Sequence, residues 1–356
     1  MTFYRLKSGI LMLNLGGPST LQEVHPFLNR LFSDKDLIPL PFQSQLGPWI
    51  AKRRAPKVQS YYNEIGGGSP IKSWSEKQGA ALIEKLNELS PSTGPHQFYL
   101  GFRYAEPLTE TALLQMKADG IENAIAFTQY PQYSCSTTGS SLNDLYRTIK
   151  KLNMENTINW KIIDRWPTHQ GFIKTVCKLI ARKLKEFEDP SKAMILFSAH
   201  SLPMSVVNRG DNYPSEVAYS VQEVMQHLEA KNPFRIVWQS KVGPLPWLGP
   251  ETKEAVEGLC KHGIKDILIV PIAFTSDHIE TLYELDIQYI KEFNANGMNV
   301  KRTDSLNVEP DFIDSLADIV MKAFSSEQSH SHQFPRRCSQ CINQTCGEMR
   351  NFFLSK

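Results

Sequence analysis

The sequence of 356 residues has no long hydrophobic run and no strong excess of charge of either sign. Its longest apolar stretch covers residues 267–274 and includes Pro271, far short of the roughly 18 consecutive apolar residues of a membrane-spanning helix. Lys and Arg together number 39 and Asp and Glu 37, so the formal net charge is only +2. This balance excludes the broad basic field of a general nucleic-acid binder, although a local basic patch is compatible with it.

The first residues lack the features of a secretory leader. Residues 2–8 are polar, and the apolar stretch 10–15 is too short and has no cleavage site after it. An organellar transit peptide would have to precede this sequence. We therefore expect a reducing compartment, in which a tight group of cysteines indicates a metal site before it indicates disulfides.

Eight short apolar segments are predicted to be β-strands, and most are continuously apolar rather than alternating. This pattern is typical of parallel strands covered on both faces. The segments are 9–15, 97–102, 124–128, 159–163, 193–197, 235–238, 266–274 and 300–303. Helical periodicity covers 74–89, 109–119, 168–187, 214–228, 251–262 and 281–293. The alternation predicts an α/β fold with a doubly wound parallel arrangement.

Two sets of four strands predict two similar halves. The motif Ala126-Phe127-Thr128 has an echo in Ala273-Phe274-Thr275, and each is expected to close the third strand of its half. We expect an N-terminal half over 1–170, a C-terminal half over 171–330 and a tail over 331–356. In such folds ligands bind beyond the carboxyl ends of the strands, so the site is sought there.

Glycines follow the first predicted strand at Gly16-Gly17 and precede a helix at Gly66-Gly67-Gly68. Neither group fits the dinucleotide-binding or the P-loop pattern, which argues against a nucleotide site. We expect tight turns at which the backbone approaches a ligand closely.

Three carboxylates, Asp277, Glu280 and Glu284, follow the seventh strand with the spacing of one α-helical face, and His278 lies beside them. A solvated helix face is the ordinary explanation of such a pattern. The position at a strand's carboxyl end favours a path for protons or for a divalent metal ion. His200 ends the fifth strand and His169 follows the fourth, and His200 is the better candidate for a base near neutral pH.

Three of the six cysteines, Cys338, Cys341 and Cys346, lie within nine residues. They are either reduced structural cysteines or ligands of zinc or an iron–sulfur cluster that needs a fourth thiolate. Cys135, in a loop at a strand end, is the candidate for the fourth. Cys177 and Cys260 fall at helical spacing on apolar faces and are expected in the core.

Two apolar segments, 27–56 and 243–250, interrupt the alternation, and the first ends with Lys52-Arg53-Arg54. They are either packed loops or apolar lips around a cleft that contact a membrane or a flat hydrophobic ligand.

Taken together, these features resemble the protoporphyrin ferrochelatases, in particular the animal mitochondrial type, over almost the whole chain. The most specific stretches are 65–72, 126–143, 197–210, 238–243 with 246–250, and 270–287. The resemblance implies insertion of Fe(II) into protoporphyrin IX with release of two protons, which is the terminal step of haem biosynthesis. It also implies two Rossmann-like halves, a [2Fe–2S] cluster on the C-terminal extension, and a homodimer on the matrix face of the mitochondrial inner membrane.

The resemblance assigns roles residue by residue. The implied active-site residues are His200, Asp277, His278, Glu280, Glu284, His169 and Asp318. The implied porphyrin-binding residues are Arg54, Tyr62, Ser69, Leu15, Arg103, Tyr104, Trp247 and Phe274. The implied cluster ligands are Cys135, Cys338, Cys341 and Cys346. Leu15 and Leu245 stand where the family often has Met, a nearly volume-conserving change that should preserve activity.

The chemistry requires a slot that bends the porphyrin, because metal cannot enter a planar ring that still carries its N–H protons. We expect His200 to accept the pyrrole protons, and the carboxylates to carry protons away or deliver iron. His169 and Asp318 could serve the metal route instead. Two alternatives are a non-catalytic porphyrin or haem carrier, which would not need the carboxylates, and a coproporphyrin ferrochelatase, whose more soluble substrate suits apolar lips less well.

Overall fold

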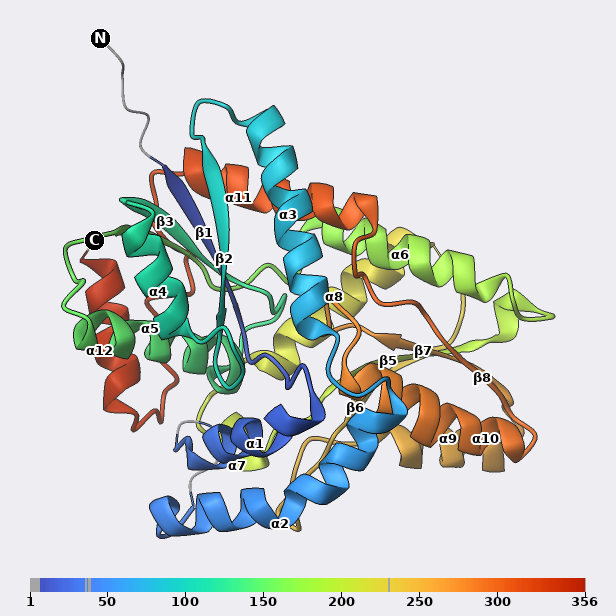
Figure 1. The fold of residues 1–356 in the computed structure, drawn as a ribbon. Helices are drawn as coiled ribbons and strands as arrows, with labels where there is room; N and C mark the ends of the chain where they lie inside the picture. Colours follow the sequence, from blue (N-terminus) through green and yellow to red (C-terminus); the bar gives the residue numbers. More distant parts are fainter. Residues whose placement is uncertain (1–6, 36, 38–39, 230, 356) are drawn as a thin grey trace. The chain divides into compact units, whose positions relative to one another are not determined.

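The computed structural model describes residues 7–35, 37, 40–229 and 231–355. The chain forms two compact units, and Figure 1 shows its elements in sequence colours. Unit 1 comprises Met1–Trp166, Ile313–Arg337 and Cys341–Lys356, and unit 2 comprises Pro167–Phe312 and Cys338–Gln340. Compactness does not test independent folding, so the division at residues 170 and 330 stays a prediction.

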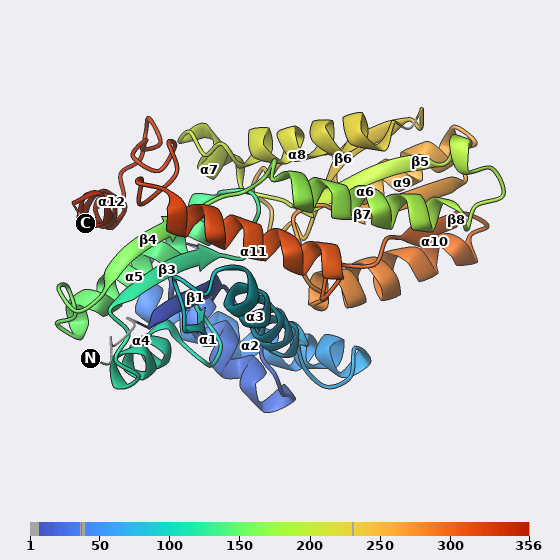
Figure 2. The same cartoon turned by 90° about the horizontal axis from the view of Figure 1, so that it is seen from above.

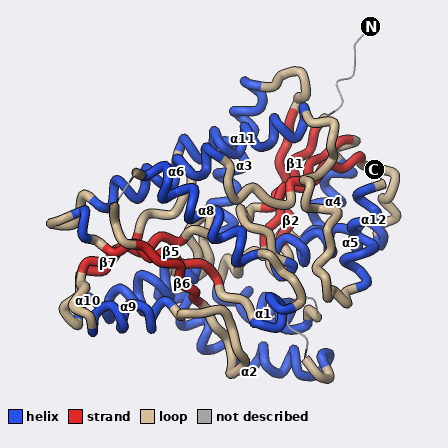
Figure 3. The backbone as a smooth tube through the Cα atoms, turned by 180° about the vertical axis from the view of Figure 1, so that it is seen from behind, coloured by secondary structure: helices blue, strands red, loops and turns tan. Residues whose placement is uncertain are grey.

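Unit 1 is built on a parallel sheet in the order β2-β1-β3-β4. Its strands are β1 (Ser8–Asn14), β2 (His96–Phe102), β3 (Asn123–Thr128) and β4 (Asn159–Ile163). Every residue of β1 is buried, because this strand lies inside the sheet and is covered on both faces. The predicted parallel α/β architecture is confirmed for this half, and helices flank the strands (Figure 3).

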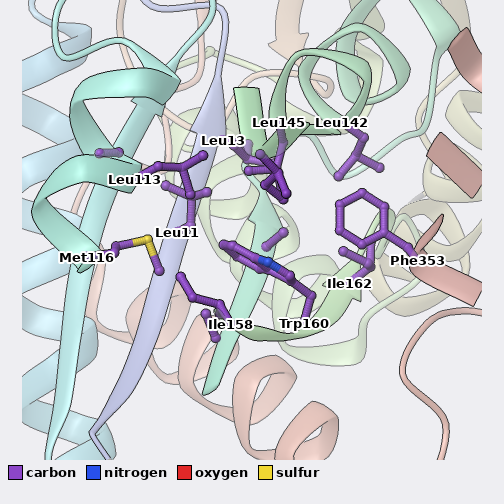
Figure 4. Close-up of a cluster of buried hydrophobic side chains, with 14 of the residues drawn as sticks. Leu11, Leu13, Leu113, Met116, Leu142, Leu145, Ile158, Trp160, Ile162 and Phe353 are labelled. Carbon is purple, nitrogen blue, oxygen red and sulfur yellow. The ribbon is translucent and has the colours of Figure 1, made fainter. Parts of the chain in front are cut away.

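One face of this sheet carries α4 (Thr109–Ala118), α5 (Ser140–Lys151) and α12 (Gln344–Leu354). Their apolar side chains meet alternate residues of the strands in one buried cluster, which Figure 4 shows around Trp160. Phe353 of α12 belongs to this cluster. The C-terminal helix is therefore part of the core of unit 1. On the opposite face lies α3 (Ile71–Leu89), whose Gly79 admits the ring of Phe98.

Most of the segment 27–56 is helical, so the alternative of a packed loop was wrong for it, whereas the segment 243–250 contains no helix or regular strand. The first segment contains most of α1 (Val24–Ser33) and the first part of α2 (Gln43–Glu64), and these helices pack against each other. Two prolines, Pro48 and Pro56, lie inside α2 and obscured it in the sequence. Each removes one backbone donor, a cost that the 22-residue length of the helix and its packing against α1 offset.

Unit 2 repeats the topology with the order β6-β5-β7-β8, and all its strands are parallel. Its strands are β5 (Met194–His200), β6 (Phe234–Gln239), β7 (Asp266–Pro271) and β8 (Asn299–Arg302). The equivalent strand order confirms two similar halves. The predicted strand 266–274 is too long, because the chain turns where the Phe274 N–H donates to the Pro271 carbonyl. The echo of Ala126-Phe127-Thr128 therefore lies just beyond β7 and not within it.

Helices cover both faces of this second sheet (Figure 2). On one face lie α6 (Gln170–Leu184) and α8 (Tyr213–Leu228), which pack side by side. On the other lie α9 (Thr252–Lys261), the π-helix η4 (Glu280–Ile290) and α10 (Lys291–Ala295).

The remaining elements of the two units are short or lie between the sheets' main helices in sequence. They are α7 (Met204–Asn208), α11 (Pro310–Ser325), the 3₁₀ turns η1 (Leu21–Glu23) and η3 (Pro190–Lys192), and the π-helix η2 (Cys135–Gly139).

Lys161 of β4 caps the carboxyl end of α11. Its ammonium donates to the carbonyls of Ala323, Phe324 and Ser326 at 2.8, 3.1 and 2.6 Å. Lys161→Met should lower the free energy of unfolding by about 1–3 kcal/mol, because it leaves the last carbonyls of a helix without their charged donor. Chemical denaturation checks this. In the control Lys151→Met, which removes an exposed ion pair with Glu110, the loss should stay below about 1 kcal/mol; equal losses would contradict the capping role.

Candidate active site and metal centre

The centre of the candidate site in unit 2 is a histidine–carboxylate pair. His200 is the last residue of β5, and its Nε2 lies 3.4 Å from Oε1 of Glu280, the first residue of η4. The Nδ1 of His200 lies 2.6 Å from the Ser201 carbonyl. His278 holds the other side of the same carboxylate, with its Nε2 3.2 Å from Oε2 of Glu280. Two imidazoles therefore share one carboxylate at the carboxyl ends of β5 and β7.

Burial lowers the pKa of His200, but the Glu280 carboxylate outweighs it and raises that pKa to about 9. Burial raises the pKa of Glu280, and the charge and hydrogen bond of His200 overcome this and hold it well below its usual range. The resting pair at neutral pH is consequently an imidazolium and a carboxylate. The imidazole is 37% exposed, so a ligand can reach it.

Glu284, the second carboxylate of η4, faces the carboxyl end of β6. It accepts hydrogen bonds from the Ser240 N–H at 2.8 Å, from the Ser240 hydroxyl at 2.5 Å, and from the Tyr289 hydroxyl at 3.1 Å. The Gln239 amide donates both to this carboxylate and to the Glu280 carbonyl. Burial, with the neighbouring charge of Glu280, raises the pKa of Glu284. This carboxylate is a proton-accepting group held next to the central pair.

Asp277 lies before the helix that carries the other two carboxylates. The helix expected over 281–293 is present, but it is a π-helix up to Ile290 and an α-helix only from Lys291. The segment from Glu280 to Ile290 is a π-helix, so α-helical spacing does not apply to it. Asp277 precedes this helix and accepts hydrogen bonds from Thr281, Ser305 and Asn307. Burial raises the pKa of Asp277, but the charge of Arg302 at 3.3 Å and the three hydrogen bonds together outweigh it, so that pKa is lowered.

Several residues around this site carried no motif in the sequence. Arg302 pairs with Asp277 and with Asp286, and so joins the start of η4 to its middle. Tyr213, the first residue of α8, is buried and hydrogen-bonds the backbone of His200. Gln239 and Ser240 lie in a predicted strand-end segment, so strand-end position alone could have found them. Arg302 and Tyr213 come from segments that had no functional signal.

His169 and Asp318 lie in different units. His169 is the residue before α6 in unit 2, and its carbonyl accepts the Ile173 N–H. Asp318 lies on α11 in unit 1, where its carboxylate pairs with Lys322 at 2.7 Å. Their expected contribution to a metal route stays a prediction.

The two glycine turns of unit 1 approach each other. A side chain at Gly17 would meet the Ser69 hydroxyl at 2.6 Å, and one at Gly68 would meet the Ser19 carbonyl at 2.1 Å. The Ser69 N–H also donates to the Pro18 carbonyl at 2.7 Å. The turns were expected to approach a ligand. In the structure, the absence of side chains at Gly17 and Gly68 lets the two turns pack against each other, and Ser69 lies at this contact.

The other predicted porphyrin-binding residues of unit 1 differ in how far their side chains are exposed to solvent. Arg54 is exposed on α2, where its guanidinium lies 5.5 Å from the Phe32 ring, whereas Tyr62 is buried on the same helix. Arg103 and the fully buried Tyr104 both bond Asp34, at 2.7 and 2.6 Å. These last two are held inside the unit by a carboxylate that the sequence did not single out.

Leu15 follows β1, and its N–H donates to the Tyr130 hydroxyl at 2.6 Å. In unit 2, the ring of Trp247 lies 6.5 Å from that of His200, and the ring of Phe274 lies 4.6 Å from that of His278. Two aromatic rings therefore border the histidine–carboxylate pair from separate loops.

All six cysteines are free. Cys135 opens η2, Cys341 packs against the core of unit 1, and Cys346 is buried in α12. Cys338 belongs to unit 2, where the neighbouring Gln340 N–H donates to the Arg209 carbonyl. Among the described residues, no three His, Cys, Asp or Glu side chains lie close enough together to hold a metal ion. Of the two other cysteines, Cys177 is partly buried as expected, but Cys260 is exposed and its assignment to the core was wrong.

The donor set nevertheless fits an iron–sulfur cluster. Four reduced thiols are the number that a [2Fe–2S] cluster or a closed zinc site requires. Beside Cys346 a buried side-chain N–H, the Nε of Arg350, has no hydrogen-bond partner among the described residues. A thiolate supplies the acceptor that a neutral thiol provides only weakly.

Among solved structures, the fold is similar to that of SirB from Bacillus subtilis with Fe³⁺, with a TM-score of 0.51 and 14% sequence identity. The match covers 90% of this chain and 96% of the other. At this identity the likeness concerns the fold alone, an α/β arrangement of two parallel sheets.

The family model described as Ferrochelatase matches residues 7–324. Proteins described as "Ferrochelatase, mitochondrial" are 57% identical in Homo sapiens, over 98% of this chain and 84% of the relative, and 56% identical in Xenopus laevis, over 98% and 85%. The Drosophila melanogaster protein is 48% identical over 98% of this chain and 91% of its own length. The chain belongs to the ferrochelatase family. It is an enzyme that inserts Fe(II) into protoporphyrin IX, and its location is mitochondrial.

Proposed function

We propose that His200 is the base that removes the pyrrole protons during iron insertion, and that Glu280 controls its protonation. The 3.4 Å contact between the two side chains carries this proposal. In the resting pair the imidazole is charged, so it must first give up its proton before it can accept one from the porphyrin. Glu280 and Glu284 are the adjacent acceptors through which protons then leave. The charge of Glu284 raises the pKa of His200, and the charge of Glu280 raises the pKa of Glu284, so the three groups are close enough to affect each other's protonation.

Asp277 is proposed to hold the proton-accepting carboxylates in place and not to transfer protons itself. Its carboxylate accepts three hydrogen bonds and an ion pair, and its pKa is lowered, so it stays ionised and bound. We propose that Asp277 fixes the start of η4 and so the place of Glu280. His278, which contacts the same carboxylate as His200, helps to hold it. His169 and Asp318 are proposed to serve the route of the metal.

The porphyrin is proposed to be bound by polar residues at its propionates and by apolar residues at its ring. Arg54 is an exposed cation for a propionate, with Ser69 and Tyr62 as hydroxyl donors. Leu15, Trp247 and Phe274 provide apolar contact. Arg103 and Tyr104, which are bound to Asp34, shape this region by holding the chain in place.

Insertion assays at a series of pH values test the base. Because kcat/KM reports the free enzyme, it should rise with pH until about 9, where the imidazole of His200 becomes mostly neutral. The raised pKa also means that the His200–Glu280 ion pair stabilises the fold fully below about pH 6.5 and is lost as the pH passes about 9. Glu280→Gln should move the titration of His200, followed by NMR, to or below its ordinary value of 6.5.

The control for this titration is Glu292→Gln, which removes a carboxylate paired with Lys253 elsewhere on the same unit. The titration of His200 should not move in this variant. A pH profile that is flat from 7 to 9 in the wild-type enzyme would contradict the proposed base.

A [2Fe–2S] cluster is proposed on Cys135, Cys338, Cys341 and Cys346. When bound, it would tie the C-terminal segment to the loop of Cys135 and stabilise the fold, because metal binding and folding are coupled. Visible absorption and iron analysis of the purified protein distinguish it from zinc.

We also propose a homodimer that binds the matrix face of the mitochondrial inner membrane, in line with the family resemblance. No helix within the described residues is long and apolar enough to cross a membrane. The apolar side chains that project most in the two lips are Phe42 at 79% exposure, Trp49 at 58% and Leu245 at 66%. Within the first lip, Leu37 and Leu40 are half-buried, and Ile38 lies outside the described residues.

Membrane contact predicts that Phe42→Ser with Trp49→Ser lowers partitioning onto anionic vesicles by at least roughly tenfold, because two exposed aromatic side chains beside Lys52 and Arg53 are the groups that would enter the interface. Vesicle sedimentation measures this. The matched control is Leu89→Ser with Leu114→Ser, two exposed apolar residues outside the lips. Partitioning of the lip variant equal to that of this control would argue against the contact.

A further inference from the structure

Arg350 is a buried arginine on α12 with only 2% of its surface exposed. Its guanidinium donates to the Tyr133 hydroxyl at 2.8 Å and to the Phe334 carbonyl, and it interacts with Cys346 one helical turn earlier. These partners come from three segments: the one that leads to Cys135, the one that leads to Cys338, and α12 itself. One side chain thus ties together the approaches to the proposed cluster ligands.

The charge of Asp164 acts on Arg350, but no carboxylate bonds the guanidinium among the described residues. Its described partners are a hydroxyl, a carbonyl and a cysteine, and it forms no ion pair with a carboxylate among the described residues. The guanidinium also lies 5.2 Å from the Phe334 ring and 5.7 Å from the Tyr133 ring. A buried cation is costly unless an anion lies near it.

A second arginine adds to the positive charge. Arg165 lies 4.4 Å from the same Tyr133 ring and pairs with the fully buried Asp164 at 2.9 Å. The charge of Asp164 thus acts on both guanidinium groups. Four cysteinates around two ferric ions and two sulfides carry a net charge of about −2, which would add negative charge beside Arg350.

We infer that Arg350 is a positioning residue of the four-cysteine site, which holds α12 and the Tyr133–Cys135 segment together and compensates the negative charge of the bound cluster. The inference rests on the [2Fe–2S] cluster of the proposed function. Hydrogen bonds and charges around the ligands set both the retention and the reduction potential of such clusters.

The test compares Arg350→Met with Arg336→Met in the purified full-length protein. Arg336 is exposed in the same tail, so the control makes the same chemical change without touching the site. Iron release to a chelator should be at least about tenfold faster in Arg350→Met than in the control. The midpoint potential should become more negative, because a nearby positive charge favours the reduced cluster. A merely structural role would speed the loss of iron but leave the potential unchanged.

Two further variants keep the test decisive if Arg350→Met does not fold. Arg350→Lys retains the charge but not the fork that reaches Tyr133 and Phe334 together, so it should lose iron faster and keep a potential close to wild type. Tyr133→Phe removes one acceptor of Arg350 and should behave in the same way. Wild-type iron retention in both variants would overturn the inference.

The two proposals fail in different ways. Colourless wild-type protein, or protein that contains zinc in place of iron, would refute the cluster itself. Wild-type protein that contains the cluster, with Arg350→Met and Arg336→Met alike in iron release and potential, would refute the role of Arg350 alone.

Discussion

His200→Ala should lower the rate of iron insertion by roughly 10²–10⁴-fold, while protoporphyrin still binds. The substitution removes the imidazole that faces Glu280 and leaves the carboxylate in contact with His278. The aromatic rings of Trp247 and Phe274 stay in place, so the apolar part of binding should persist. Rates come from an insertion assay with Fe(II) or Zn(II), and porphyrin binding from fluorescence.

The control for this variant is His227→Ala. His227 also lies near a carboxylate, with its Nδ1 4.0 Å from Glu223, but on α8 and outside the site. Its rate should equal that of wild type. A rate for His200→Ala within a factor of ten of wild type would exclude His200 as the base, and loss of porphyrin binding would assign it to binding instead.

Cys341→Ser should remove the proposed cluster and with it much of the stability of the protein. A hydroxyl is a poor replacement for a thiolate, so iron and sulfide content should fall at least about tenfold. Cys341 is packed against the core cluster of unit 1, and loss of the bound group should loosen its segment. We expect the apparent melting temperature to fall by at least about 5 °C, a change that corresponds to a destabilisation of a few kcal/mol.

The matched control is Cys260→Ser, an exposed cysteine on α9. It should keep full iron content and an unchanged melting temperature. If Cys341→Ser retains iron and the visible absorption bands, Cys341 is not a ligand and the proposed four-cysteine site is wrong.

Much of the fold could be predicted from the sequence because each strand is a continuous apolar run of its own. All eight strands of the described residues were predicted, six of them within one residue of their bounds, and the fifth strand continues three residues further than predicted. The seventh predicted strand extended too far, since apolarity alone cannot show that the chain turns after Pro271. Helix α2 was missed because Pro48 and Pro56 are breakers in isolation, and the packing that tolerates them is tertiary.

In the candidate site, residue type and strand-end position were enough to select His200, His278, Glu280 and Glu284. The helical spacing assigned to the carboxylates was wrong, since a π-helix cannot be distinguished from an α-helix by an apolar pattern. Arg302, Tyr213 and Asp34 were missed for a different reason. Each acts through a partner far away in sequence, such as Asp277 for Arg302, and no local pattern marks such a pair.

The sequence by itself determined three things: a parallel α/β protein in two similar halves, the absence of a long apolar span or a broad basic field, and a group of cysteines suited to metal. The burial and spacing of apolar residues are local properties, so they can be inferred without coordinates. Only the tertiary structure decided that Glu280 lies between two imidazoles, that Asp277 is bound to Arg302, and that Arg350 is buried without an ion pair to a carboxylate among the described residues. Protonation and charge compensation depend on neighbours in space, which the chain brings together from distant positions in the sequence.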